Sequence, residues 1–210
     1  MAIEAGYKGL ASANSGEGQY NAINFLVRQI LNGVRTATLV QIVSVTNSGG
    51  VSPVGFVDAQ PLVNQLDGYS NAIPHGVLHH LPYMRIQGGA NAVIIDPQVG
   101  DIGIAVFADR DISSVCANKA QSNPGSFRQF DMADGMYIGG LLNGAPVQFV
   151  QFETGGITIT SPNKITLTAP AVQINGSVTV TGDLTAQGTS VHTHVHGGVQ
   201  SGGSNTGVPV

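Results

Sequence analysis

The chain has few charged residues, one cysteine and no tryptophan. Only 10% of its 210 residues are charged, against about 25% in an average soluble domain. Because Cys116 has no second cysteine to pair with, an intrachain disulfide is excluded, and we expect folding in a reducing cytoplasm. With eight Lys and Arg and a formal net charge of −4, the chain lacks the clustered cations that bind phosphates. Nucleic acid is therefore not an expected partner.

Long apolar runs and catalytic signatures are also missing. The N-terminal MAIEAGYKGL resembles no signal peptide, and no window reaches the roughly 18 apolar residues of a membrane span, so we expect a cytoplasmically made protein. Neither a phosphate-binding G-x-x-x-x-G-K-[ST] nor a G-x-S-x-G nucleophile elbow occurs. Four acidic residues invite an acid–base role, but nothing indicates a cleft between them. We expect no enzyme, and expect turn capping and pairing with Arg110 from Asp96, Asp101, Asp109 and Asp111.

Two further groups of reactive residues also have structural explanations. The motif PHGVLHH contains His75, His79 and His80, but adjacent residues on a strand face opposite ways. We therefore expect structural or surface roles for these histidines rather than a metal site. Cys116 has no recognisable partner base nearby in the sequence, which predicts an inert thiol.

Residues 1–33 combine a Gly/Ser/Asn-rich arm with one short amphipathic helix. Asn21 is a candidate N-cap, and Gly33 is a natural stop. We expect the apolar stripe of this helix to pack on the next domain or on a sister subunit rather than to line a cofactor groove. The residues that recur at helical spacing are Ile23, Leu26, Val27, Ile30 and Leu31.

Residues 34–116 contain five β-branched runs separated by Gly, Pro, Asn and Asp clusters. No helical pattern alternates with these runs, which favours a small antiparallel barrel, and an OB-fold fits this size best. Residues 117–148 then read as a connector punctuated by Pro and Gly. The five runs are RTATLVQIVSVT, GVSPVGFVDAQPLV, HGVLHHLPYMRI, GANAVIID and DIGIAVFA.

Residues 149–191 form a degenerate repeat of very short strands in which apolar residues alternate with Thr, Gln or Asn. Two inward side chains per rung cannot enclose a core within one chain. We therefore expect three chains wound about one axis as a homotrimeric β-prism or intertwined β-helix, with a monomeric β-solenoid as the alternative. The apolar pairs are Ile157 and Ile159, Ile165 and Leu167, Val172 and Ile174, and Val178 and Val180.

The final segment, residues 192–210, begins with HTHVHGG. On a strand His192, His194 and His196 would share one face. A His-x-His pair from each of three chains offers six imidazole nitrogens, an octahedral set that suits iron, cobalt or nickel better than four-coordinate zinc. The alternatives are a disordered tail or the remnant of an expression tag.

Several long motifs resemble the central spike proteins of contractile phage tails, the baseplate assembly protein V family. They are VGFVDAQPLVNQLDG, PYMRIQGGANAVIIDPQVGDIGIAVFADRDIS, MYIGGLLNGAPVQF and HTHVHGGVQSGGSNTGVPV. The resemblance implies a homotrimer whose OB-fold joins the tail tube and the baseplate hub, followed by a β-helical spike. It also implies one iron ion per trimer, held at the apex by His194 and His196 of each chain. Because this sequence offers a third histidine, His192 with His194 is the second choice.

The resemblance also accounts for the composition of the C-terminal region. After Val150 the only charged residues are Glu153, Lys164 and Asp183, and moving one charge into hydrocarbon costs on the order of 3 kcal/mol. We therefore expect a virion protein at the tip of the tail baseplate, in a phage or related injection particle. It would pierce the outer membrane of the host mechanically when the sheath contracts. The alternative is a trimeric fibre or adhesin-type stalk that binds a cell-surface receptor.

Overall fold

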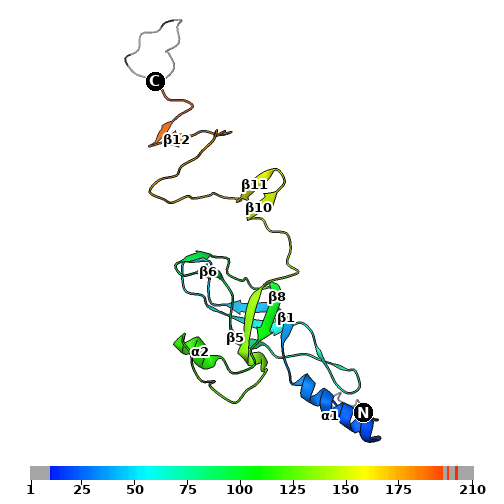
Figure 1. Cartoon of the computed structure of the whole chain (residues 1–210). Coiled ribbons are helices and arrows are strands. Elements are labelled where there is room, and N and C mark those ends of the chain that lie inside the picture. Colours follow the sequence, from blue (N-terminus) through cyan, green and yellow to red (C-terminus); the bar gives the residue numbers. More distant parts are fainter. Residues whose placement is uncertain (1–9, 196–197, 199–201, 203–210) are drawn as a thin grey trace. The chain divides into compact units, whose positions relative to one another are not determined.

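The computed structural model describes residues 10–195, 198 and 202. The chain divides into two compact units, Met1–Pro146 and Val147–Val210, and strands outnumber helices in it (Figure 1). The first unit contains α1 (Gln19–Asn32), β1 (Ala37–Val45), β2 (Phe56–Pro61), β3 (Gln65–Leu66), β4 (Ala72–Ile73), β5 (Leu78–Pro82), β6 (Ile86–Gly88), β7 (Asn91–Val93), β8 (Ile102–Phe107), α2 (Ser113–Asn118), the 3-10 turn η1 (Met132–Asp134) and β9 (Gly135–Gly140).

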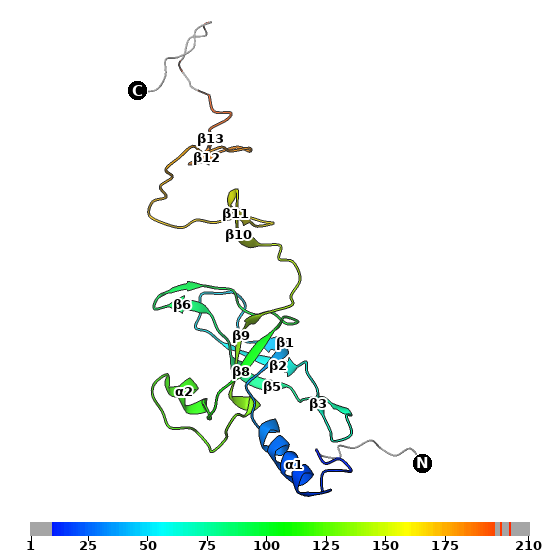
Figure 2. The ribbon, with the colours of Figure 1, turned by 45° about the vertical axis from the view of Figure 1, so that its right-hand side comes forward.

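The first unit is built on one curled, five-stranded sheet with the order β5-β2-β1-β8-β9. All four neighbouring pairs are antiparallel, and Figure 2 shows β8 between β1 and β9. The two edge strands then approach each other, because Tyr83 and Tyr137 form a parallel bridge in which the Met84 amide donates to the Tyr137 carbonyl at 2.7 Å. The sheet is therefore a half-barrel, which confirms the all-β prediction for this unit.

The core of the half-barrel is small and follows the two-residue period of its strands. Val57 and Ala59 are buried on β2, while their neighbours are only half-buried. A Cβ added at Gly103 on β8 would lie 2.1 Å from the Gly139 carbonyl oxygen, so this close approach of β8 and β9 requires glycine. The complete buried apolar set among the described residues is Val40, Ile42, Val57, Ala59, Leu81, Tyr83, Ala105 and Tyr137.

The fifth strand of the sheet differs from the one expected from the sequence. The run GANAVIID forms β7, which pairs only with β6 in a separate hairpin whose six residues are all exposed. The sheet instead takes β9, from residues 117–148, which the sequence suggests to be a connector. β9 is hard to recognise because its sequence GMYIGG is half glycine, and glycine is depleted in strands.

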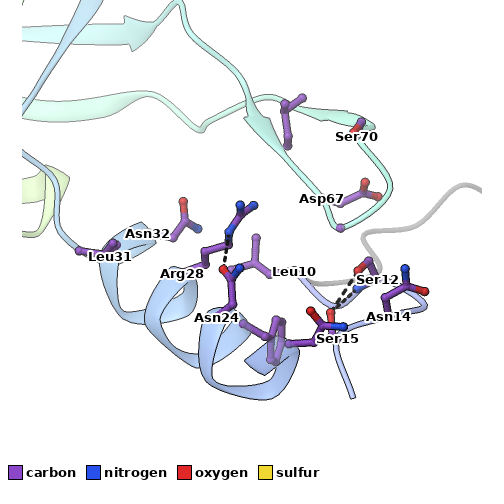
Figure 3. A pocket seen from close by; sticks show the side chains of 14 residues that line it. Leu10, Ser12, Asn14, Ser15, Asn24, Arg28, Leu31, Asn32, Asp67 and Ser70 are labelled. Carbon is purple, nitrogen blue, oxygen red and sulfur yellow. Dashed lines mark hydrogen bonds between the residues drawn. The ribbon is translucent and has the colours of Figure 1, made fainter. Parts of the chain in front are cut away.

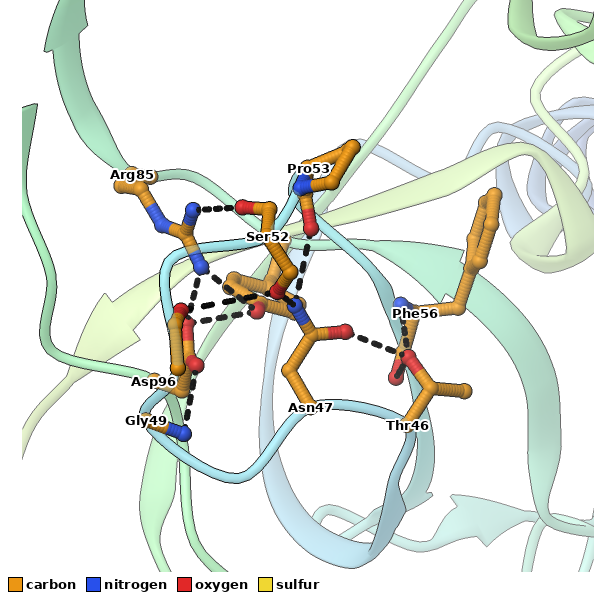
Figure 4. Close-up of polar contacts among 10 residues, drawn as sticks. Thr46, Asn47, Gly49, Ser52, Pro53, Phe56, Arg85 and Asp96 are labelled. Carbon is orange, nitrogen blue, oxygen red and sulfur yellow. Dashed lines mark hydrogen bonds and ion pairs between the residues drawn. The ribbon is translucent and has the colours of Figure 1, made fainter.

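A buried ion pair ties together three connections at one end of the sheet (Figure 4). Arg85 and Asp96 lie 2.6 Å apart, Nη2 to Oδ1, and each side chain is only 3% exposed. The same carboxylate accepts the Tyr83 hydroxyl at 2.7 Å and the Gly49 amide at 2.9 Å. Arg85 also donates to the Ser52 carbonyl. The β1–β2 loop, the segment after β5 and the segment after β7 therefore share one carboxylate.

Helix α1 ends where the sequence predicts, at the Gly33 C-cap, but it begins earlier than expected. The N-cap is Gly18, and the Asn21 side chain donates to the Glu17 carbonyl at 2.9 Å, so the prediction of Asn21 as the cap was wrong. No residue of α1 is buried. Within residues 10–195, no helix has the length and apolar character needed to cross a membrane.

Candidate functional site

The second unit begins with a hairpin that has one apolar face. Strands β10 (Phe149–Glu153) and β11 (Gly156–Thr160) pair so that Val150 lies opposite Ile159 and Phe152 lies opposite Ile157. Residues directly opposite each other in an antiparallel pair point to the same side. These four side chains therefore form one apolar face, and they are 56–77% exposed in the single chain.

The chain between the two hairpins of this unit continues the apolar rows but forms no strand. Residues 161–184 lack regular secondary structure, and every apolar pair predicted there is exposed. A strand needs a neighbouring backbone to hydrogen-bond. The short strands expected around Ile165, Val172 and Val178 are therefore not seen in one copy. In the described residues of this unit, no side chain is buried.

A second hairpin and a turn organise the end of the described chain. Strands β12 (Thr185–Ala186) and β13 (Thr189–Ser190) are joined by Gln187 and Gly188, both with positive φ, as a tight two-residue turn requires. Asp183 accepts the Ser190 hydroxyl at 2.8 Å, and its second contact, with the His192 amide at 3.4 Å, is longer. Sequence reasoning did not identify Asp183 as a residue that shapes this end.

The histidine segment starts in a turn rather than on a strand. Residues 191–193 form the turn, and the His194 amide donates to the Ser190 carbonyl at 3.1 Å. The expected shared strand face for His192 and His194 is therefore not seen in the single chain, while His196 lies outside the described residues. His192 and His194 are both exposed. The described residues hold no group of three or more His, Cys, Asp or Glu that would bind a metal within one chain.

The His194 ring makes a contact that fixes its tautomer. Its Nδ1 atom lies 3.0 Å from the Val191 carbonyl oxygen. Because a carbonyl can only accept, this contact requires the proton on Nδ1, which in the neutral ring places the lone pair on Nε2. A backbone carbonyl on one ring nitrogen is a common second contact of metal-binding histidines, whose other nitrogen ligates the metal.

The three remaining histidines have local partners in the first unit. His79 contacts Asp58 at 3.1 Å, His75 contacts Gln65 at 2.9 Å, and His80 stacks on Phe56 with ring centroids 3.7 Å apart. His79 and His80 together face one residue of β2, so they form a bulge. These contacts are structural, as expected for PHGVLHH.

Asp101 and Asp111 accept backbone amides within turns, as predicted, but the predicted pairing with Arg110 was wrong. Arg110 donates only to the neighbouring Asp109 carbonyl, whereas Asp96 pairs with Arg85. Asp111 and the buried Asp134 both pair with Arg128, at 3.1 Å and 3.0 Å. Asp111 also accepts the amide of Ser113, the first residue of α2, at 2.9 Å. The sequence did not identify the ion pairs of Arg85 and Arg128, because these residues meet their carboxylates only in the folded chain.

We expect Asp111→Asn to lower the melting temperature at neutral pH, and to lower it less as the pH falls below about 4. Hydrogen bonds from Ser113 and Ser126 hold the pKa of Asp111 well below its ordinary value of 3.8. A lowered carboxyl pKa stabilises the fold above the unfolded-state pKa, and this contribution disappears as the pH falls through the folded-state pKa. Circular dichroism melts across the acid range measure the difference. The exposed Asp109→Asn is the control, and a pH-independent difference for Asp111→Asn would contradict the argument.

The second unit is charge-poor, and its described part combines exposed apolar rows with histidines near its end. The model of the GpV Apex motif matches residues 188–210, within this unit. The match supports membership of the chain in the phage baseplate assembly protein V and spike family. No curated protein matches the chain.

The family match also bears on catalysis, on location and on metal binding. Proteins of the spike family are structural rather than catalytic, in agreement with the non-enzymatic role expected from the sequence. The match suggests a component of the virion tail. The Apex motif is typically associated with a metal-binding tip, although it does not identify the metal.

Proposed function

We propose that this chain is the central baseplate spike of a contractile phage tail or a related injection particle. Sheath contraction drives it mechanically through the outer membrane of the host, with no bond chemistry. One observation carries the proposal: in residues 147–195 rows of apolar side chains are exposed and no residue is buried. Such a segment is completed by other chains, and a Gly-rich apex follows it.

The partner chains in this proposal are two further copies of the same chain. The apolar face of β10–β11 and the rows of residues 161–184 then converge on a shared axis, which supplies the missing core. Thr, Gln and Asn side chains remain outside, and backbone edges pair between chains. The curled sheet of the first unit is assigned to the OB type, a five-stranded partly open barrel, and contacts the baseplate hub and the tail tube.

The residues at the apex fit a metal ion. Three chains bring six imidazoles from His194 and His196, with His192 and His194 as the second choice of pair. The lone pair placed on His194 Nε2 is of the kind that first-row transition metals accept. Iron is the proposed ion, one per trimer. When bound, it links three chain ends that have no further rung to pair with, and it couples their order to metal binding.

Added surface charge is expected to impair penetration. Residues 154–210 carry only Lys164 and Asp183 as charges, and each ammonium forced into hydrocarbon costs on the order of 3 kcal/mol. We expect particles whose spike carries Thr166→Lys, Thr168→Lys and Thr179→Lys to infect or kill less efficiently than particles with glutamine at the same positions. Infection is measured by plaque or killing assays, after confirming that both spikes assemble.

Equal infection by the lysine and glutamine particles would remove the argument for membrane passage. The adhesin-type alternative predicts a different result for the isolated protein. A purified spike that binds host cells saturably, and competes with particle adsorption, would favour receptor binding over puncturing.

A further inference from the structure

Helix α1 carries an apolar stripe that its own chain leaves uncovered. The side chains of Tyr20, Ile23, Val27 and Ile30 are 47–78% exposed. Val34, just beyond the C-cap, extends the row and is also exposed. The spacing alternates between three and four residues, which is the a/d pattern of a coiled coil.

The opposite side of α1 faces its own unit. Asn24, Phe25 and Arg28 line a pocket closed by the arm around Leu10 and by the β3–β4 hairpin (Figure 3). Arg28 Nε donates to the Asn24 side chain at 2.8 Å on this side. Leu31 also lines this pocket, whereas Tyr20, Ile23, Val27 and Ile30 do not. The intramolecular contacts of α1 therefore use the side that holds Asn24, Phe25 and Arg28, and they leave the row from Tyr20 to Ile30 exposed for another molecule.

The length and ends of α1 show that it needs such a partner. It has 14 residues, and isolated helices shorter than about 12–15 residues are marginal in water. No side chain caps its N-terminus, and it has neither acidic residues in the first turn nor basic residues in the last. Its only charged residue, Arg28, lies on the pocket side. Copies of the stripe can therefore meet without charge repulsion.

We infer that three copies of α1 pack along their apolar stripes as a parallel three-helix bundle, forming a second threefold contact in addition to the spike. Val27 occupies an a position, and the d positions hold Ile23 and Ile30 rather than the leucine that favours two-stranded coiled coils. The inference rests on the homotrimer proposed above, which supplies three helices of the same chain in one orientation.

Disulfide trapping in the full-length trimer tests the bundle. In a Cys116→Ser background, Val27→Cys places a thiol on the stripe, and Gln29→Cys places one on an exposed part of the helix outside both the stripe and the pocket. Only thiols whose Cα atoms approach within about 7 Å can be linked. We expect oxidation to link two chains per trimer at position 27 on the order of tenfold faster than at position 29. The mass of the protein in solution should be that of a trimer both before and after oxidation.

Two readouts separate the failure of this inference from failure of the homotrimer. A trimeric mass with equal or absent linking at position 27 would overturn the helix bundle and leave the spike trimer standing. A monomeric mass would overturn the homotrimer itself, and the bundle with it. As a second measurement, Ile23→Asn with Ile30→Asn should speed hydrogen exchange of the α1 amides in a protein that stays trimeric. Unchanged exchange would overturn the helix bundle.

Discussion

The double substitution Ile157→Asp and Ile159→Asp is expected to convert the protein from a trimer to a monomer. Both residues lie on the apolar face of β10–β11, opposite Phe152 and Val150. In a spike with a shared axis these carboxylates would be buried close to their copies in the sister chains. Each unpaired buried charge costs several kcal/mol, which exceeds the roughly 1.5–3 kcal/mol gained by burying one isoleucine. Light scattering should give 21.5 kDa for the variant and three times that mass for the parent.

The matched control places two carboxylates on the other face of the same hairpin. Gln151 and Thr160 alternate with the apolar residues along their strands and point away from the proposed axis. Gln151→Asp with Thr160→Asp should therefore remain trimeric. If the Ile157→Asp and Ile159→Asp variant also remains trimeric, the apolar face does not lie at the axis.

The double substitution His194→Ala and His196→Ala is expected to remove the metal and leave the trimer. The two imidazoles are the proposed ligands of each chain, so their loss leaves no nitrogen donor from this pair. The spike rungs that are proposed to hold the chains together are unchanged. Elemental analysis should fall from about one iron ion per trimer to background, as all six of the proposed ligands are lost. A purified double variant that still holds iron in this ratio would show that other residues are the ligands.

Single substitutions decide which histidine pair is used. If His194 and His196 are the ligands, His192→Ala retains the metal and His196→Ala loses it. If the pair is His192 and His194, the two results exchange. His75→Ala is the control for a histidine that contacts Gln65 in the first unit, and it should leave the metal content unchanged.

Local patterns predicted most of the elements that depend on neighbouring residues in the sequence. The stripe of α1 and its stop at Gly33 follow from helical periodicity and glycine chemistry, and β1, β2, β5 and β8 follow from β-branched runs. β9 was not predicted, because Gly135, Gly139 and Gly140 are untypical of a strand. The strand forms there through its pairing with β8. The ion pairs did not follow either. Arg110 is nearer to Asp111 in the sequence, but the fold brings Arg128 to it.

In the C-terminal region the sequence pattern is clear, but the structure of a single chain does not show what the pattern is for. The alternation of apolar and polar residues is clear in the sequence, yet in residues 147–195 one copy of the chain forms only two short hairpins. In the proposed homotrimer this pattern describes contacts between chains, whereas a single copy can satisfy only contacts within itself. The alternation around Ile165 and Val172 would then be explained by the assembly.

The carboxylate of Asp96 has a consequence for the local opening of the first unit. It holds Gly49, Tyr83 and Arg85 at once, so the loop after β1 cannot detach without giving up a contact that the segments after β5 and β7 also use. Segments joined in this way open as one cooperative unit with one free energy. Backbone amides in these three stretches, although far apart along the chain, would then exchange with solvent at closely matched rates and slow down or speed up together.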